Sequence, residues 1–120
     1  MSKKILLTDD DREFVEAMKT RLEGDGYTVT VAYDGDECID LARQVKPDIM
    51  ITDVSMPKMD GYSMVKAIKQ DNEIKHIPII ILSGKDQMEE IFKMEGINEF
   101  LVKPFEYDVL MQKVKSLTGA

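Results

Sequence analysis

The hydrophobic positions of this chain form five short runs, separated by longer stretches in which apolar residues recur every third or fourth position. Each run is brief and is bounded by polar or turn-forming residues, which is typical of buried strands. The predicted strands are Lys4–Thr8, Thr28–Ala32, Asp48–Thr52, Ile79–Leu82 and Phe100–Val102. Because these runs are nearly continuous in their apolar character, they predict a parallel sheet that is covered on both faces.

The stretches between the strands predict five amphipathic helices. Phe14, Met18 and Leu22 mark the first helix, and the glycines that follow are typical of a helix C-terminus. The other helices are marked by the apolar positions within Cys38–Val45, Met64–Ile68, Met88–Phe92 and Leu110–Leu117. Strands that alternate with helices in this way predict a doubly wound α/β fold.

Length and composition predict one globular domain that spans residues 1–120. The chain has 120 residues, of which 43% are hydrophobic and 32% are charged. These values are ordinary for a folded domain and differ from those of disordered chains. The formal net charge of −7 would repel a phosphate backbone, so we expect no direct nucleic-acid binding.

The methionines and the single cysteine indicate structural roles. Of nine methionines, most are expected to fill gaps in the core, as at Met18 and Met50, while Met59 and Met111 are the candidates for exposure. Cys38 is the only cysteine, so neither an intrachain disulfide nor a cysteine metal cluster can form. The N-terminal apolar run ends too soon for a signal peptide or a membrane span. We therefore expect a cytoplasmic protein without membrane insertion.

Polar residues stand at the carboxyl ends of four predicted strands, where open parallel sheets bind their ligands. These residues are Asp9 and Asp10, Asp53, Ser83, and Lys103. Each of them also has a simpler interpretation. Asp10 with Glu13 resembles a helix capping box, Asp53 and Ser83 could be loop residues, and Lys103 could be a solvated charge. Four strand ends that each carry such residues at one sheet edge favour a functional site.

Electrostatics and the lack of other motifs narrow the chemistry of that site. Like charges ~4 Å apart repel by about 4 kcal/mol at an effective dielectric near 20, so three carboxylates need a cation, and Mg²⁺ suits them. A calcium loop, a zinc site and glycine-rich nucleotide loops are missing from the sequence, and His76 is given no role. A carboxylate can instead act as a nucleophile toward a phosphoryl group and form an aspartyl phosphate.

These residues and their order resemble those of response-regulator receiver domains. The resemblance rests on Asp9-Asp10, the segment from Asp53 to Gly61, Ser83 after an apolar strand, and Lys103-Pro104-Phe105, and it covers essentially the whole chain. It implies a flavodoxin-like fold of five parallel strands in the order 2-1-3-4-5 with five helices.

The resemblance also implies a role for each site residue. Asp53 would be the phosphoacceptor, and Asp9, Asp10, Asp53 and the backbone carbonyl of Ser55 would hold Mg²⁺. Lys103 would contact the phosphoryl group, while the Ser83 hydroxyl and the Phe100 ring would form the switch. The donor would be a histidine kinase or a phosphotransfer protein in a two-component pathway, and the domain would catalyse only its own phosphorylation and dephosphorylation.

The output surface implied by the resemblance is the face of the fourth helix, the fifth strand and the fifth helix, with an unknown partner. The spacing of 17 positions from Ser83 to Phe100 is shorter than is usual in the family by about half a helical turn. We therefore expect a short fourth helix or an altered loop before it.

Two other functions remain open from the sequence. A flavin-binding module could share this fold, although Asp9, Asp10 and Asp11 would repel a flavin phosphate. Alternatively, a receiver-like domain could act only as a docking surface without phosphorylation. The latter would be expected to have lost at least one of the acid, hydroxyl or lysine positions, all of which are filled here.

Overall fold

A computed structural model of the chain describes residues 2–54, 61–83, 93, 96–97 and 99–119. Its strands are β1 (Lys4–Thr8), β2 (Thr28–Ala32), β3 (Ile49–Asp53), β4 (Ile79–Ser83) and β5 (Glu99–Val102). Its helices are α1 (Arg12–Gly24), α2 (Gly35–Val45), α3 (Gly61–Gln70) and α5 (Tyr107–Thr118). The helix predicted around Met88–Phe92, with its expected shortening, lies outside the described residues. None of the helices in the described ranges is long and apolar enough to cross a membrane.

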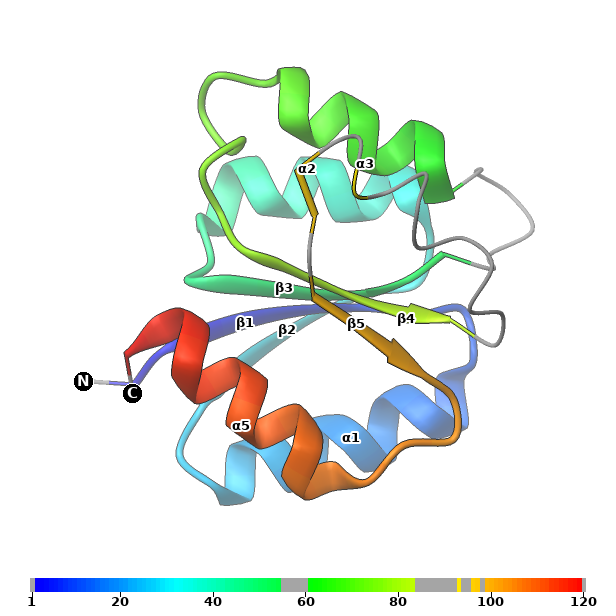
Figure 1. Ribbon diagram of the computed structural model, residues 1–120, viewed down its shortest axis with the longest axis vertical. Coiled ribbons are helices and arrows are strands. Elements are labelled where there is room, and N and C mark those ends of the chain that lie inside the picture. Colours follow the sequence, from blue (N-terminus) through cyan, green and yellow to red (C-terminus); the bar gives the residue numbers. More distant parts are fainter. Residues whose placement is uncertain (1, 55–60, 84–92, 94–95, 98, 120) are drawn as a thin grey trace.

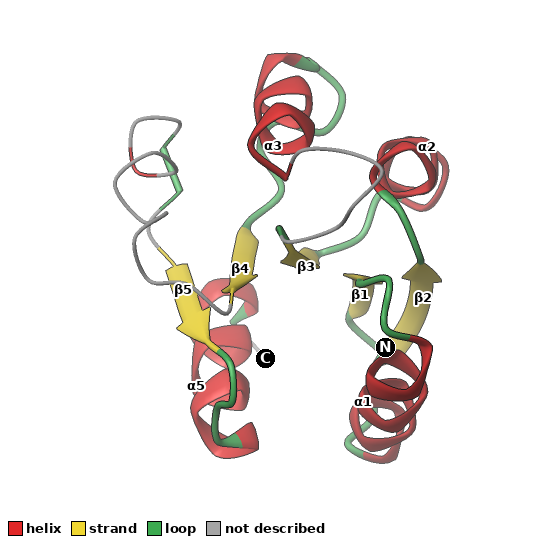
Figure 2. Ribbon diagram, turned by 90° about the vertical axis from the view of Figure 1, so that its right-hand side faces the viewer, coloured by secondary structure: helices red, strands yellow, loops and turns green. Residues whose placement is uncertain are grey.

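The five strands form one parallel sheet in the order β2-β1-β3-β4-β5. This arrangement confirms the predicted doubly wound, flavodoxin-like fold. Figures 1 and 2 show α2 and α3 on one face of the sheet and α1 and α5 on the other. The chain moves outward from β1 to β2 and then returns to place β3 on the other side of β1, so the strand order reverses between β1 and β3. In folds of this kind, ligands bind at the carboxyl ends of the strands beside that reversal.

Alternate residues of each strand supply two separate hydrophobic layers. Leu6 and Met50 belong to the core cluster on the α2 and α3 side, whereas Leu7 and Ile51 belong to the cluster on the α1 and α5 side. All four are fully buried. Because helices cover both faces, β3 and β4 are buried along their whole length, which explains their continuous apolar sequence.

Helix α1 begins at a cap one residue later than the sequence suggested. The carboxylate of Asp11 accepts a hydrogen bond from the backbone N–H of Phe14 at 3.2 Å, which satisfies one of the unpaired donors of the first turn. The capping-box interpretation of Asp10 with Glu13 is therefore wrong. Asp34 caps α2 in the same way through the N–H of Glu37.

The methionines follow the prediction only in part. Met50 is fully buried as expected, but Met111 is 8% exposed and packs in the cluster beneath α5. The prediction that Met111 is exposed is thus wrong, because the apolar stripe of a helix covers adjacent positions such as Leu110 and Met111 together. Met59 lies outside the described residues.

Candidate functional site

Two buried aspartates lie next to each other at the carboxyl end of the sheet. Asp53 is the last residue of β3, and Asp9 directly follows β1. Thr8 and Thr52 are partners in the β1–β3 register, so Asp9 and Asp53 each lie one residue beyond that pair. Their exposed fractions are only 1% and 5%. The reversal point of the sheet therefore carries two carboxylates that have little access to water.

Asp10 completes a cluster of three acids. Carboxylate oxygens of Asp9, Asp10 and Asp53 all lie within 4.8 Å of one another, and only Asp10 is exposed. Two like charges at this separation repel by about 3–4 kcal/mol at an effective dielectric near 20. The structure brings together the three acids that the sequence proposed as metal ligands, and the arrangement requires nearby positive charge.

The backbone of the loop after β1 holds Asp9 in place. Its Oδ1 atom accepts a hydrogen bond from the backbone N–H of Asp11 at 3.0 Å, and its own N–H donates to the carbonyl of Ala32 at 3.2 Å. Since the Asp11 side chain caps α1, one short turn fixes both a site carboxylate and the start of a helix. Asp10 has no part in that cap, so it is not needed to begin the helix.

Lys103 supplies a positive charge next to the two buried acids. It follows β5, and its backbone N–H donates to the carbonyl of Ser83 at 2.8 Å. Its ammonium nitrogen, Nζ, lies 2.6 Å from Asp9 Oδ2 and 3.9 Å from Asp53 Oδ2, and its side chain is 28% exposed. One ammonium group thus forms ion pairs with both buried acids.

The two predicted switch residues occupy neighbouring strands. Ser83 ends β4, is 6% exposed, and pairs with Val102 of β5 in the register. Phe100 lies two residues before Val102, opposite Ile81, and its half-buried ring packs against the core on the α2 and α3 side. Asp53 pairs with Leu82 of β4, and Ser83 is the next residue after Leu82.

The donor set fits a hard divalent cation. Magnesium prefers carboxylate oxygens and usually keeps several waters, and the exposed side of the cluster at Asp10 is open to them. Asp9 already contacts a cationic group, the Lys103 ammonium, so positive charge is favoured at this position. Asp9, Asp10 and Asp53 would hold the ion. The carbonyl of Ser55, the fourth proposed ligand, lies outside the described residues.

Two contacts at the site were missed from the sequence. The sequence shows Asp11 only as part of an acidic run, whereas its carboxylate caps α1 in the structure. The sequence places Phe14 on the apolar stripe of the first helix, but its ring also faces the ammonium of Lys103, with Nζ 4.4 Å from the ring centroid. The pattern of apolar residues finds the helix face but carries no signal for a contact with a lysine 89 positions away.

Cys38 and His76 take no part in the site. Cys38 is fully buried in α2, and burial raises the pKa of its thiol to about 11, so it stays protonated and unreactive near neutral pH. His76 is exposed in the segment before β4. The chemistry of this edge of the sheet therefore rests on carboxylates, a hydroxyl and an amine.

Comparison with known protein families accounts for this arrangement. A family described as "Response regulator receiver domain" matches residues 5–115. The chain belongs to the response-regulator receiver family. Among curated receiver-containing relatives, it is 34% identical over 119 residues to PhoP of Bacillus subtilis, the alkaline phosphatase synthesis transcriptional regulatory protein. It is 35% identical over 120 residues to the response regulator PleD of Caulobacter vibrioides.

The receiver matches differ in how much of each protein they cover. The alignment includes 98% of this chain in both cases, but only 49% of PhoP and 26% of PleD. This receiver chain thus spans about half of the one relative and about a quarter of the other. In those two proteins, the region that aligns with this chain is accompanied by further sequence.

Two solved structures match this chain along nearly their whole length. The chemotaxis protein CheY4 of Vibrio cholerae has a TM-score of 0.90 at 30% identity, with 98% of this chain and 99% of that chain covered. The response regulator TrrA of Thermotoga maritima, solved in complex with Mg²⁺ and BeF, has a TM-score of 0.85 at 30% identity, with coverages of 96% and 98%.

Proposed function

We propose that residues 1–120 form one receiver domain that accepts a phosphoryl group on Asp53 in a Mg²⁺-dependent reaction. The observation that carries the proposal is the position of Lys103 Nζ, 2.6 Å from Asp9 and 3.9 Å from Asp53, beside three clustered acids. The donor would be a histidine kinase or a phosphotransfer protein. We also propose a cytoplasmic location, which the single cysteine supports.

The transfer would use the carboxylate of Asp53 as the nucleophile. One of its oxygens forms a bond to phosphorus while the bond from phosphorus to the donor nitrogen breaks, and the electron pair of that bond stays on the imidazole. The product is an aspartyl phosphate. Attack by water on phosphorus would later release inorganic phosphate and restore the carboxylate. The domain would thus catalyse only its own phosphorylation and dephosphorylation.

The remaining residues would stabilise charge on the transferring group. Phosphoryl transfer depends mainly on positioning and on cations near the phosphoryl oxygens. Lys103 brings its ammonium within 3.9 Å of Asp53 Oδ2, and Asp9 keeps that ammonium in place through the 2.6 Å contact. Magnesium held by Asp9, Asp10 and Asp53 would add positive charge next to the same oxygens.

Ser83 and Phe100 would report phosphorylation to a partner. A hydroxyl bonded to a charged acceptor contributes about 1.5–3 kcal/mol, enough to shift a two-state equilibrium by one to two orders of magnitude. The output face would include β5 and α5, where Val102 and Val109 are 43% and 39% exposed. The fourth-helix part of that face lies outside the described residues.

Phosphorylation of the intact protein tests the assignment of Asp53. With acetyl phosphate and Mg²⁺, the parent should gain one phosphoryl mass and Asp53→Asn should gain none, as measured by intact-protein mass spectrometry. Asp36→Asn is the matched control, since it makes the same change at an exposed acid of α2 and should react like the parent. Gain in Asp53→Asn, or none in the parent, would contradict the proposal.

A second arm separates the chemistry from the switch. Ser83→Ala should still gain the phosphoryl group, because the transfer rests on the cations, but it should lose most of the amide NMR shifts that beryllofluoride causes across residues 99–117 of the parent. A full parental shift pattern in Ser83→Ala would show that Ser83 does not couple the site to the output face.

A further inference from the structure

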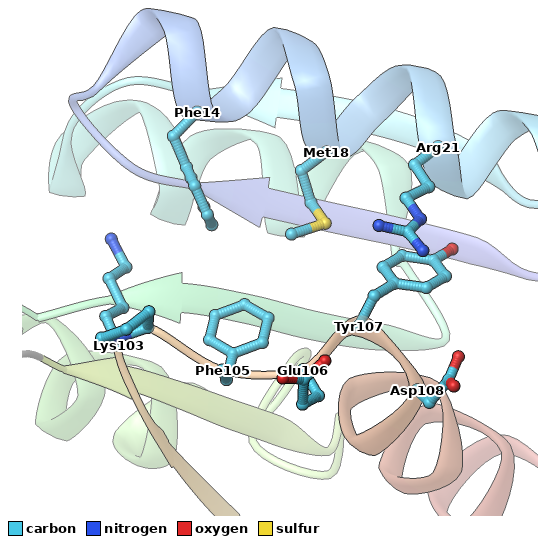
Figure 3. Close-up of a pocket in the computed structure, with 9 residues that line it drawn as sticks. Phe14, Met18, Arg21, Lys103, Phe105, Glu106, Tyr107 and Asp108 are labelled. Carbon is cyan, nitrogen blue, oxygen red and sulfur yellow. The ribbon is translucent and has the colours of Figure 1, made fainter.

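One aromatic side chain outside the acid cluster touches the key ammonium group. Lys103 Nζ lies 4.4 Å from the centroid of the Phe14 ring, within the ~6 Å over which the negative face of a ring attracts a cation. Figure 3 shows the two residues on opposite walls of a cavity, with the Lys103 amino group directed toward α1, which carries Phe14. The ammonium therefore has a carboxylate on one side and an aromatic face on another.

The cavity gives Lys103 room to leave the site. Its volume is about 550 Å³, and it lies between α1 and the segment that joins β5 to α5; Met18, Arg21, Phe105 and Tyr107 are among its lining residues. A lysine side chain has a flexible four-carbon stem, and this one is 28% exposed. Something must hold its end beside the acids, and the described contacts offer only Asp9, Asp53 and the Phe14 ring.

Phe14 is itself fixed by the residues that build the site. The backbone N–H of Phe14 donates to the capping carboxylate of Asp11. The backbone N–H of Asp11 in turn donates to Asp9 Oδ1. Its ring also meets Phe105 edge to face, with centroids 6.4 Å apart and an interplanar angle of 83°. The turn that orients Asp9 therefore also sets the position of the aromatic face over Lys103.

We propose that Phe14 is a positioning residue that keeps the Lys103 ammonium beside Asp9 and Asp53. It does not touch the reacting atoms, and it acts through Lys103. The inference rests on the proposed phosphorylation of Asp53, because its consequence for the reaction is a Lys103 that is already in place when the phosphoryl group arrives. A small displacement of such a group is costly to a transfer that depends on positioning.

The first test is spectroscopic and needs neither metal nor donor. In the parent, the Phe14 ring current should shift the ε-methylene protons of Lys103 upfield. Phe14→Leu should abolish that shift while keeping an apolar side chain, and Phe14→Tyr should restore it, since the open cavity leaves space for the added hydroxyl. Phe105→Leu is the matched control. It removes the other ring of the same pair but keeps an apolar side chain against Phe14 and leaves the Asp11 cap intact, so the Lys103 shift should remain.

The second test measures phosphorylation by acetyl phosphate with Mg²⁺ in the same variants. At saturating donor, Phe14→Leu should react about three- to tenfold more slowly, as expected for loss of a partly desolvated cation–π contact. Phe14→Tyr should recover most of the rate, and Phe105→Leu should stay within about twofold of the parent, since the ring that lies over the Lys103 ammonium is that of Phe14.

The outcomes separate this inference from the function on which it rests. A parent that reacts while Phe14→Leu keeps the parental rate overturns the positioning role alone. An equal loss of rate in Phe105→Leu assigns the effect to packing and also overturns the positioning role. An unchanged Lys103 shift in Phe14→Leu overturns that role as well. A parent that gains no phosphoryl group instead contradicts the proposed function itself, and the spectroscopic arm then reports only whether the contact exists.

Discussion

Two ion pairs of this domain share one distance and differ in their surroundings. Lys103 Nζ lies 2.6 Å from Asp9 Oδ2, and Arg43 Nε lies 2.6 Å from Asp71 Oδ2. In the first pair, the Asp9 side chain is 1% exposed, faces two further acids and meets a lysine that is 28% exposed. In the second, the Asp71 side chain is 13% exposed and meets an arginine that is 51% exposed. The first pair lies at the carboxyl end of the sheet, and the second ties α2 to the segment after α3.

The difference shows that short distance alone does not set the worth of an ion pair. An exposed pair competes with water and salt, so its net contribution is small. A pair with a buried member is costly to form but still more costly to break, because one charge is then left without a partner. Apolar residues could fill the same space without the cost of burying charge. The buried pair is therefore better explained by a role in the chemistry of the site than by a contribution to stability.

Removing the cation from each pair should give the largest contrast. In metal-free buffer, Lys103→Met should lower the free energy of unfolding by about 2 kcal/mol, because Asp9 is left buried among acids; partial exposure of Lys103 keeps this below the 3–5 kcal/mol of fully buried pairs. Arg43→Met is the matched variant and should leave the urea midpoint nearly unchanged. Equal losses in the two variants would remove the distinction between the pairs.

The smallest effect concerns the pH dependence of the exposed pair. The hydrogen bond from Arg43, and next the backbone N–H of Glu73, lower the pKa of the Asp71 carboxyl. A lowered pKa in the folded state means that the pair stabilises the protein above the ordinary Asp pKa and that this contribution disappears as the pH falls through the folded-state value.

Carboxyl NMR titration can follow Asp71 directly. Arg43→Met should raise its titration midpoint toward the ordinary Asp value without fully reaching it, because the Glu73 N–H still donates to Asp71 Oδ1. Any stability difference between the parent and Arg43→Met should vanish in acid. An unchanged midpoint in the variant would show that Arg43 does not hold the Asp71 carboxylate in solution.

The fold and the location of the site could be predicted from the sequence because both depend on patterns that are local along the chain. Apolar runs placed the strands, and the rule that parallel strands end at one edge brought Asp9 and Asp53 together. The Asp48–Thr52 prediction was displaced by one residue, since the strand is Ile49–Asp53. That displacement makes Asp53 the end of the strand itself.

Other features depend on three-dimensional contacts that no local pattern contains. Which acid caps α1 is decided by the geometry of one turn, so the choice between Asp10 and Asp11 could not be made from spacing alone. The width of the apolar face of α5 decided the burial of Met111. The Phe14–Lys103 contact joins two elements far apart in the chain, and the periodicity of α1 explains Phe14 without it.

Thermal unfolding with and without Mg²⁺ shows whether Asp9, Asp10 and Asp53 are held together for a divalent cation. Without Mg²⁺, Asp10→Asn should be at least as stable as the parent, because one repulsive charge is gone. Magnesium at ten times its dissociation constant should then stabilise the parent by about 1.4 kcal/mol and the variant far less, so that the stability difference between them shifts in the parent's favour. The exposed control Asp36→Asn should respond like the parent. An equal Mg²⁺ response in Asp10→Asn and the parent would contradict the claim.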